Sequence, residues 1–547
     1  MSSFSRLLTY WHTIRHLRPV QFYGRVWFRL VTPRPDLRDA PSVRIRSGPW
    51  SSPARRRASL TEPSTFRLLN IEHSLTEIGW DSAIVDRLWR YNMHYFDDLN
   101  SEGADAREDW HRALLARWVR ENPPVEGTGW EPYPTSLRIV NWIKWVLAGH
   151  VLPPDCVDSL AVQTRWVAKR LERHLLGNHL FVNAKALTFS GLYFSGPEAE
   201  RWLEKGMHIL ARQMPEQILA DGGQFERSPM YQALALDDLL DLCNVSVAFR
   251  GAVPRRWHRF VDGWPAVAAR MRLWLATVSH PDGEISLFND AAFGVAPRLE
   301  ELHAYATRIA IPRSEALVDG VTHLSESGYV RVQRESLIAV LDVGRIGPDF
   351  LPAHAHADTL SFELSLFGHR VVVNSGTSQY GTGAERLRQR GTAAHSTVTV
   401  DGFDSSEVWS VFRVARRAQP IDLRFAQADG TIVVSCSHDG YERLPGRPVH
   451  RREWRFGSEY LLIVDRVSGS FTEAVSRFYL HPTVDVLTAR ELRLPNGHRV
   501  RWFVGGGNSR VVRSTWHPEF GMSVVNHCIE IAFSGREASL HLQWKSN

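Results

Sequence analysis

The spacing of apolar residues changes once along this chain, near residue 320. Before that point apolar side chains recur every three or four residues, as in 110–119 and 137–146, which predicts amphipathic helices. After it come short apolar or alternating runs such as 337–343, 360–366 and 461–467, separated by Gly, Asp or Asn, which predict strands. Successive helices favour a layer of helical hairpins, and successive short strands favour an antiparallel sandwich or barrel. The expected fold class is therefore α+β, with a helical domain followed by a β domain.

The first 65 residues differ from both of these domains. Residues 1–30 mix arginines with apolar and aromatic residues, and residues 31–65 are rich in Pro and Arg, a composition that resists regular structure. The expected organisation is a basic, aromatic arm and linker over 1–65, a helical domain over 66–318 and a β domain over 319–547. The arm could lie on an anionic membrane surface. Packing on its own protein as an amphipathic helix is the preferred interpretation.

Composition excludes several classes of protein. The formal net charge is +6 over 547 residues, and the basic residues form no run typical of nucleic-acid binding, so no nucleic-acid partner is expected, whereas an acidic ligand is. The four cysteines form no CxxC pair, and no apolar run is long enough to predict a transmembrane span. Arginines interrupt the apolar N-terminal residues, so no cleavable signal is expected. The cytoplasm is then the default location, with the periplasm or cell envelope as the alternative, and the oligomeric state stays open.

The β domain contains a dense cluster of titratable residues at 354–358, His-Ala-His-Ala-Asp. In an extended segment, positions two apart point the same way, so His354, His356 and Asp358 are predicted to share one face. The small alanines leave access for a ligand. The alternative is a loop of solvated histidines.

A metal site is a second possibility in the same domain. Asn374 ends one predicted strand and His395 begins another, and with His356 they offer two imidazoles and one oxygen, a set that suits Zn²⁺ if a water completes it. Asn374 brings no negative charge to the cation. Its alternative role is that of a turn residue before Ser375-Gly376.

The helical half offers polar residues near predicted helix ends. Asn178 and His179 follow Gly177, where an Asn is often only a cap. The segment 221–231, DGGQFERSPMY, carries Glu226, Arg227 and Tyr231 ahead of a helix. Tyr231 is either a core residue or a phenolic acid or base.

Aromatic and basic residues suggest where a sugar acid could bind. Trp130 and Tyr133 are candidate platforms for sugar rings. Arg386, Arg388 and Arg390 alternate just before His395 and could face a sulfate or carboxylate, the alternative being a solvated edge.

Five motifs in this order resemble those of the heparinase II/III-like polysaccharide lyases, a family that includes related alginate lyases. The resemblance covers roughly residues 90 to 540 and rests on order and spacing. The motifs are Asn178-His179, DGGQFERSPMY at 221–231, HAHAD at 354–358, VVNSGT at 372–377 and AAHSTV at 393–398. It implies an incomplete (α/α) toroid followed by an antiparallel β-sandwich, in agreement with the change of period.

The resemblance also implies a chemistry, β-elimination at a uronic acid in an acidic polysaccharide, which leaves a 4,5-unsaturated sugar. By this analogy Asn178 binds the sugar carboxylate with His179 beside it. Tyr231 protonates the departing oxygen and acts as base for one substrate epimer, and His354 is the other base or a charge stabiliser. The metal positions of the family match His356, Asn374 and His395, where the middle ligand is usually Asp, so the possible zinc rests on an altered ligand set.

Two other functions fit the same residues. Helical toroids also host glycoside hydrolases, for which Glu226 with Asp97 or Asp98 would be the acid and base. In a non-catalytic protein that binds or assembles a polysaccharide, these residues would only bind the sugar. The products formed from an acidic glycan distinguish the three.

Overall fold

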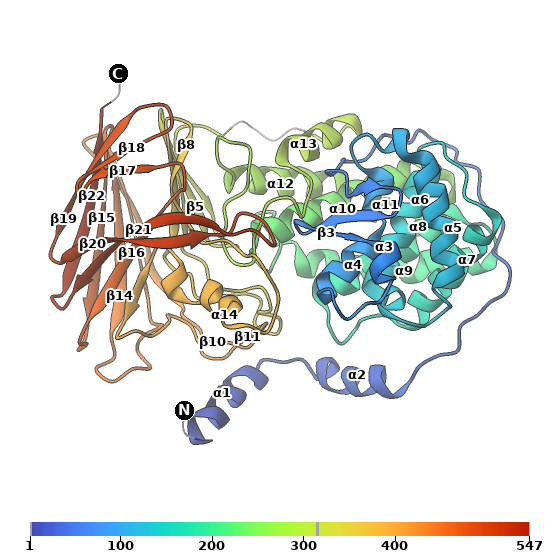
Figure 1. Cartoon of the computed structure of the whole chain (residues 1–547), viewed down its shortest axis with the longest axis horizontal. Coiled ribbons are helices and arrows are strands. Elements are labelled where there is room, and N and C mark those ends of the chain that lie inside the picture. The colour runs from blue at the N-terminus through green and yellow to red at the C-terminus, as the bar shows by residue number, and fades with distance from the viewer. Residues whose placement is uncertain (1–2, 313–316, 546–547) are drawn as a thin grey trace.

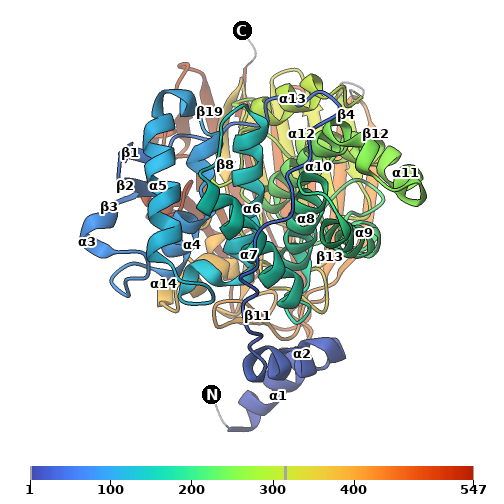
Figure 2. The same cartoon turned by 90° about the vertical axis from the view of Figure 1, so that its right-hand side faces the viewer.

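The computed structural model describes residues 3–312 and 317–545, and shows a helical domain and a β domain side by side (Figure 1). An arm of two helices, α1 (Ser3–Ile14) and α2 (Pro19–Leu30), lies at one end of the molecule outside both domains. Residues 31–59 then run along the outside of the helical domain without regular structure apart from a single bridge at Val43 (Figure 2). Residues 3–30 thus form two helices rather than one, and the irregular stretch ends at Leu60, before residue 65.

A small sheet stands in the sequence between the linker and the first long helix of the helical domain. Its three antiparallel strands are β1 (Leu60–Glu62), β2 (Thr65–Leu68) and β3 (Ile71–Ser74), followed by the single turn α3 (Leu75–Ile78). The change of period did not predict this sheet, because strands of three or four residues are too short to show a period.

The helical domain is built from ten helices among the described residues. Five of them, α6, α7, α9, α10 and α12, have Pro in the first turn, where a missing N–H costs nothing. The ten are α4 (Arg87–Tyr95), α5 (Glu108–Glu121), α6 (Pro132–Leu147), α7 (Pro154–Lys169), α8 (Gly177–Tyr193), α9 (Pro197–Gln217), α10 (Pro229–Ala248), α11 (Arg255–Asp262), α12 (Trp264–Thr277) and α13 (Leu299–Arg308).

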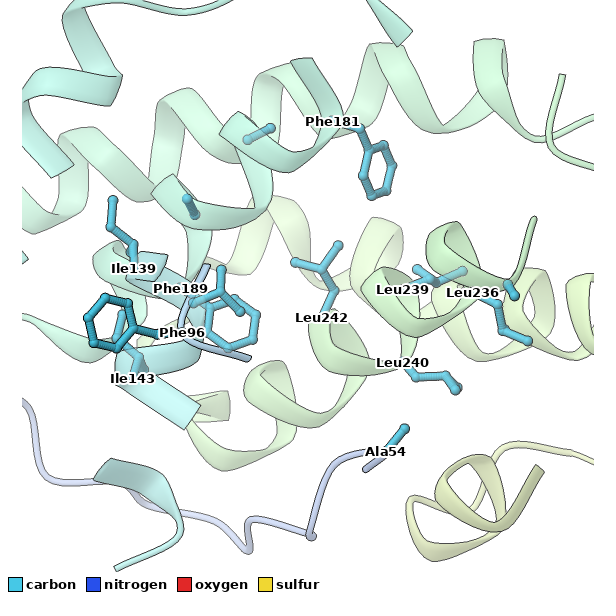
Figure 3. Close-up of a cluster of buried hydrophobic side chains, with 14 of the residues drawn as sticks. Ala54, Phe96, Ile139, Ile143, Phe181, Phe189, Leu236, Leu239, Leu240 and Leu242 are labelled. Atoms are coloured by element: carbon cyan, nitrogen blue, oxygen red, sulfur yellow. The ribbon is translucent and has the colours of Figure 1, made fainter. Parts of the chain in front are cut away.

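Helices α8 and α10 form the centre of this domain, since both are buried nearly all round. Leu236, Leu239 and Leu240 of α10 lie in one apolar cluster with Phe189 of α8 (Figure 3). A helix that is apolar on every side has to be surrounded by other helices. The remaining helices surround these two as an incomplete (α/α) toroid, as expected.

The β domain is a sandwich of two antiparallel sheets, as expected. The eight-stranded sheet has the order β12-β13-β14-β15-β22-β19-β18-β17, and the other sheet has the order β20-β21-β16-β8-β7-β6-β5-β4 with β9 paired to β16. Apolar side chains from both sheets form one core, to which Phe362 of the second sheet and Trp454 of the first contribute. The strands of the first sheet are β12 (Pro420–Ala428), β13 (Thr431–His438), β14 (Val449–Phe456), β15 (Tyr460–Ser468), β17 (Asp485–Thr488), β18 (Glu491–Arg493), β19 (Arg499–Gly505) and β22 (Glu537–Trp544).

The second sheet faces the helical domain. Its strands are β4 (Gly320–Leu324), β5 (Tyr329–Arg334), β6 (Leu337–Asp342), β7 (Phe362–Leu366), β8 (His369–Val373), β9 (Val398–Val400), β16 (Ala474–Leu480), β20 (Asn508–Trp516) and β21 (Val524–Phe533). Tyr329, Val373 and Trp516 of this sheet belong to the apolar core of the helical domain. The two domains therefore share a packed interface. The long β6–β7 and β8–β9 connections extend from the sheet next to that interface.

Candidate active site

The candidate site lies where two helices of the toroid begin next to loops of the sandwich. Asn178 and His179 are in the first turn of α8, and Tyr231 is in the first turn of α10. His354 and His356 come from the β6–β7 connection. The unpaired N–H groups at a helix start favour negative charge, so two helix starts suit an anionic sugar.

Tyr231 and His354 lie against each other across the domain junction. Their rings stack with centroids 4.0 Å apart and planes 29° apart. The Tyr231 hydroxyl is 3.3 Å from the hydroxyl of Tyr380, which comes from the β8–β9 connection. Burial and the neighbouring Tyr380 raise the pKa of Tyr231 well above its usual range. Tyr231 is therefore a neutral phenol at neutral pH and a proton donor.

One buried carboxylate, Asp290 in the α12–α13 connection, holds His354. Asp290 Oδ2 is 2.8 Å from Nδ1 of His354, and Oδ1 is 2.8 Å from Nε2 of His356. Arg386 donates to both oxygens of the same carboxylate. Burial alone would raise the pKa of Asp290, but Arg386 and the two imidazoles outweigh it and hold that pKa well below its usual range. Asp290 is thus an anion at any physiological pH.

The charge on Asp290 fixes the tautomer of His354. An ionised carboxylate only accepts hydrogen bonds, so Nδ1 of His354 must carry a proton and donate it. In its neutral form the imidazole would have its lone pair on Nε2, which lies 3.7 Å from Oε2 of Glu226. This arrangement leaves Nε2 of His354 as the proton acceptor of the site.

Glu226 is the second carboxyl group next to His354, and it accepts fewer hydrogen bonds than Asp290 does. Its Oε1 accepts a hydrogen bond from Gln224 at 3.2 Å, whereas its buried Oε2 has no hydrogen-bond partner among the described residues. Burial raises the pKa of Glu226, against the opposing effect of His354. Gly177 lies next to Glu226, since a Cβ on Gly177 would be 3.4 Å from Oε1. The start of α8 and the Tyr231–His354 pair therefore belong to one site.

His179 lies at the start of α8, where its protonated form is favoured. Its Nδ1 is 3.1 Å from Oε1 of Glu172, and its ring lies 4.4 Å from that of Tyr133. Burial opposes protonation, but the Glu172 carboxylate outweighs it and raises the pKa of His179. Asn178 is half-buried beside it. The structure thus brings Asn178, His179, Tyr133 and Glu226 to the region of Tyr231 and His354.

The HAHAD loop does not present three groups on one open face. A turn at 353–354 replaces the expected extended segment, so only His354 is partly open. His356 is completely buried behind it, and Asp358 is buried with Oδ2 accepting from the backbone N–H of Asn289 at 3.0 Å. His356 and Asp358 therefore support the loop from within.

The predicted metal residues lie together but do not form a zinc site. His356 Nδ1 is 3.3 Å from His395 Nε2, and because His356 donates through Nε2 to Asp290, His395 donates to His356. Oδ1 of Asn374 accepts from the N–H of Ser396, and its buried Nδ2, which cannot ligate a cation, has no hydrogen-bond partner in the described part of the chain. Among the described residues no group of three His, Cys, Asp or Glu side chains is arranged to hold a metal ion. The residues present do not fit a three-ligand zinc centre, and we assign no step to a metal.

The predicted arginines are used inside the protein. Arg390 is buried and donates to the carbonyl oxygens of Ala355 and Ser410, so it holds the loop before His356. Arg388 is engaged by Glu385, Thr515 and His517. Arg390 is therefore closed off from a ligand, whereas Arg388 is partly exposed but held by these three partners, and Arg386 binds Asp290.

Two further predictions of substrate contact are also placed elsewhere. Trp130 is buried in the toroid core, packed 5.7 Å from Trp118, and its Nε1 donates to the carbonyl of Asn122. Arg227 turns away from the site, with its guanidinium donating to the carbonyl oxygens of Glu326 and Arg345. Neither side chain is available as a sugar contact.

Sequence reasoning missed Asp290 and Tyr380. Asp290 stands in an ordinary Asn-Asp turn, and Tyr380 follows the VVNSGT motif by three residues. No local pattern marks either residue, because their role comes from contacts with residues more than 60 positions away. Only the proximity of Tyr380 to a recognised motif was a usable signal.

A helical toroid joined to a β-sandwich defines a two-domain class of proteins, and in this chain a tyrosine and a histidine stack at the domain junction. Within that class the chain belongs to the heparinase II/III-like family. The family model for the heparinase II/III N-terminus matches residues 84–309, and that for the heparinase II/III-like C-terminal domain matches residues 318–545.

Individual relatives are more distant. The chain is 26% identical over 339 residues to a heparin-sulfate lyase of Bacteroides stercoris, covering 58% of this chain and 47% of that protein. It is also 26% identical over 323 residues to a heparin-sulfate lyase of Pedobacter heparinus, covering 54% and 45%. The chain spans about half the length of these relatives.

Solved structures share the fold at low sequence identity. A crystal structure of heparinase III has a TM-score of 0.69 at 15% identity and covers 96% of this chain and 89% of its own. Heparan sulfate lyase HepC from Pedobacter heparinus has a TM-score of 0.56 at 18% identity, covering 88% and 81%. At these identities the structures establish the fold alone.

Proposed function

We propose that this chain is a lyase that cleaves an acidic, uronate-containing polysaccharide by β-elimination and leaves a 4,5-unsaturated sugar. The observation that carries the proposal is the Tyr231–His354 pair at the domain junction, with His354 oriented by the buried Asp290. A proton donor and a proton acceptor in contact are what this elimination requires.

The difficult step is removal of the proton at C5 of the uronic acid. The neighbouring carboxylate is ionised, so the carbanion that forms is close to a dianion and must be stabilised. The start of α8 places Asn178 and a cationic His179 where they can bind that carboxylate, and the helix dipole adds to their effect. This supports an acidic sugar as the substrate.

The two reacting groups have distinct roles in the proposal. Nε2 of His354, which holds the lone pair, takes the C5 proton. The C4–oxygen bond breaks, its electrons leave with the oxygen, and the neutral phenol of Tyr231 protonates that oxygen. The Tyr380 hydroxyl can donate a hydrogen bond to the Tyr231 oxygen, which leaves the Tyr231 proton free for the departing sugar oxygen. Glu226 can accept a hydrogen bond from a sugar hydroxyl through Oε2, which has no hydrogen-bond partner among the described residues.

The direct test is product formation. The protein is incubated with heparan sulfate, alginate and acidic bacterial exopolysaccharides, and absorbance from the new C4=C5 bond is followed in the ultraviolet. We expect Tyr231→Phe and His354→Ala each to lower kcat about 100- to 10,000-fold, the usual contribution of one proton-transfer group. Tyr193→Phe is the matched control, because Tyr193 is also a buried tyrosine of the helical domain. It should retain full activity.

The same assay tests the alternatives. Cleavage with incorporation of water and without ultraviolet absorbance would indicate a glycoside hydrolase and refute elimination. The geometry does not favour that alternative, since Asp98 is occupied by Arg107, His111 and the backbone N–H of Ser59. Binding of a glycan that is unchanged by both substitutions, with no cleavage, would refute catalysis altogether.

A further inference from the structure

The positive charge of this chain is concentrated in the arm. Residues 1–35 contain six arginines and neither Asp nor Glu, so they carry a formal charge of +6, equal to that of the whole chain. The other 512 residues contain 59 basic and 59 acidic side chains and are formally neutral. The charge therefore belongs to the arm and its first linker residues, and no catalytic residue proposed above lies there.

Each helix of the arm also exposes an apolar stripe. The spacing i, i+3, i+4, i+7 occurs twice, and such residues lie on one face of a helix. In α1 the stripe is Leu7, Tyr10, Trp11 and Ile14, and in α2 it is Tyr23, Val26, Trp27 and Leu30. These side chains are 42% to 78% exposed. We call these eight residues the arm stripes.

Other faces of both helices already pack against the body. Thr13 of α1 is buried and accepts a hydrogen bond from Trp409 of the β domain. In α2, Gln21 donates to the carbonyl of Phe350, and Phe28 packs on His174 of the toroid with ring centroids 4.3 Å apart. The ring of Tyr10 also packs on that of Trp409, with centroids 5.2 Å apart. The other arm-stripe residues keep much of their apolar surface exposed after the arm has packed on its own protein.

The two helices offer this surface at one end of the molecule. In two views at right angles, α1 and α2 both lie below the two domains (Figure 1 and Figure 2). A flat surface brought to that end would meet the arm before either domain.

A cavity next to α2 extends the positive surface. It has a volume of about 630 Å³ and lies between α2 and helices α8 and α9. Val20, Leu180 and Ile209 form apolar parts of its wall, and Arg173, Arg201, Lys205 and Arg212 add four cationic groups against the single carboxylate of Glu204. Burial and the charge of Arg173 lower the pKa of Lys205. These crowded cations would be stabilised by an anion.

We propose that the arm is a membrane-surface docking site, in which α1 and α2 lie in the interface of a bilayer that contains anionic phospholipids. Helices with Trp, Tyr and Leu on one face and Arg at the sides bind such interfaces through apolar burial and attraction to acidic headgroups. Among the described residues no helix has the length and apolarity of a membrane span. The contact is therefore peripheral, and the anionic headgroup is the chemistry that complements both the arm and the cavity beside it. The inference does not depend on the proposed lyase activity.

The test is sedimentation of the full chain with vesicles. Vesicles of phosphatidylcholine alone are compared with vesicles that contain about 30% phosphatidylglycerol, at low and at high salt. We expect at least about tenfold stronger binding to the anionic vesicles, and weaker binding at high salt. Trp11→Glu/Trp27→Glu should lower binding about tenfold or more, because a carboxylate on each stripe opposes both apolar burial and headgroup attraction.

Two further variants make the result specific. Arg6→Gln/Arg15→Gln/Arg29→Gln removes three exposed charges without changing the arm stripes, and should abolish the preference for anionic vesicles. The matched control is Ile84→Glu/Val318→Glu, which places carboxylates on apolar residues that are 84% and 72% exposed elsewhere. This control should bind as the unsubstituted chain does. Far-ultraviolet circular dichroism of every variant should match that of the unsubstituted chain.

Three outcomes would overturn the proposal. The unsubstituted chain could fail to bind anionic vesicles, or the tryptophan variant could bind them as strongly as the unsubstituted chain. Light scattering could instead show a dimer that the tryptophan variant loses, without vesicle binding, in which case the stripes are covered by a second copy of the chain.

Discussion

At the scale of single residues, the site is organised by Asp290. This one carboxylate orients His354, supports His356 and neutralises the buried Arg386. Removing any one of the groups that compensate a buried charge is strongly destabilising. The orientation of the His354 imidazole is therefore set by a buried carboxylate.

Asn374 determines whether the pair His356–His395 can hold a metal. We expect Asn374→Asp to bind Zn²⁺ about 10- to 100-fold more tightly than the unsubstituted chain, because it adds the anionic oxygen that the two imidazoles lack. Titration calorimetry with Zn²⁺ measures the change. For the unsubstituted chain, we expect a chelator to leave the rate of product formation unchanged.

Asn526→Asp is the control for this substitution. Asn526 is also a buried asparagine of the sheet that faces the helical domain, but it is bonded to the carbonyl of Leu480. It should leave zinc affinity unchanged. Isolation of the unsubstituted chain with one tightly held zinc ion would contradict our interpretation of Asn374.

Site residues could be predicted from sequence only where they belong to a recognisable motif. Asn178, Tyr231 and His354 stood in such motifs, and the structure brings Tyr231 and His354 into contact. Arg390 also stood beside a motif, but its guanidinium N–H groups already donate hydrogen bonds to backbone carbonyl oxygens. Sequence cannot show which donors the fold has already used, and for the same reason Asp290 was not foreseen.

At the scale of secondary-structure elements, the start of α10 is bonded to the α12–α13 connection that carries Asp290. Ser228 caps this helix by accepting from the N–H of Tyr231 at 3.2 Å, and its hydroxyl donates to the carbonyl of Asp290 at 2.6 Å. One side chain therefore positions both the proton donor and the carboxylate that orients the acceptor.

Removal of this cap should affect both stability and rate. We expect Ser228→Ala to lower the free energy of unfolding by about 1–2 kcal/mol, the usual cost of a lost N-cap. We also expect a fall in kcat with little change in KM, because Tyr231 loses its position and the binding groups of α8 do not. Denaturant unfolding and steady-state kinetics measure the two effects.

Ser246→Ala provides the comparison on the same helix. Ser246 is buried near the other end of α10, and among the residues that the structure describes its hydroxyl bonds only within the helix, to the carbonyl of Cys243. It should leave kcat unchanged. A Ser228→Ala variant with normal kcat would show that the cap does not position Tyr231.

The long elements were predictable and the short ones were not. Helices such as α6 and α12 are long enough for several turns of the 3.6-residue period, and strands such as β14 and β22 alternate over eight residues. The sheet of residues 60–74 has strands of only three or four residues. Its position is set by packing against the toroid, where Phe66 contacts Trp89, and not by local pattern.

At the scale of the whole molecule, buried neutral histidines make stability depend on pH. Burial lowers the pKa of His94 to about 3, from 6.5 in the unfolded chain. Below pH 6.5 the unfolded state binds a proton here that the native state does not. Stability from this group is thus complete above pH 6.5 and is lost as pH falls.

We expect the free energy of unfolding of the helical domain to fall between pH 7 and pH 5, by up to about 1.4 kcal/mol per pH unit for each such group. His94→Gln should be less stable at pH 7 and show a shallower decline. Denaturant unfolding followed by tryptophan fluorescence at several pH values measures this. His208→Gln, on an exposed histidine, should keep the original slope. An unchanged slope in His94→Gln would contradict the assignment.

The arm restricts how the two domains of the molecule can move relative to each other. Its first helix is bonded to Trp409 of the sandwich, and its second helix is bonded to Glu216 of the toroid through Arg18 and to Phe350, four residues before His354. Any hinge motion that separates the two bodies must therefore break one of these attachments. A force on the arm would be transmitted to the loop that carries the reacting imidazole.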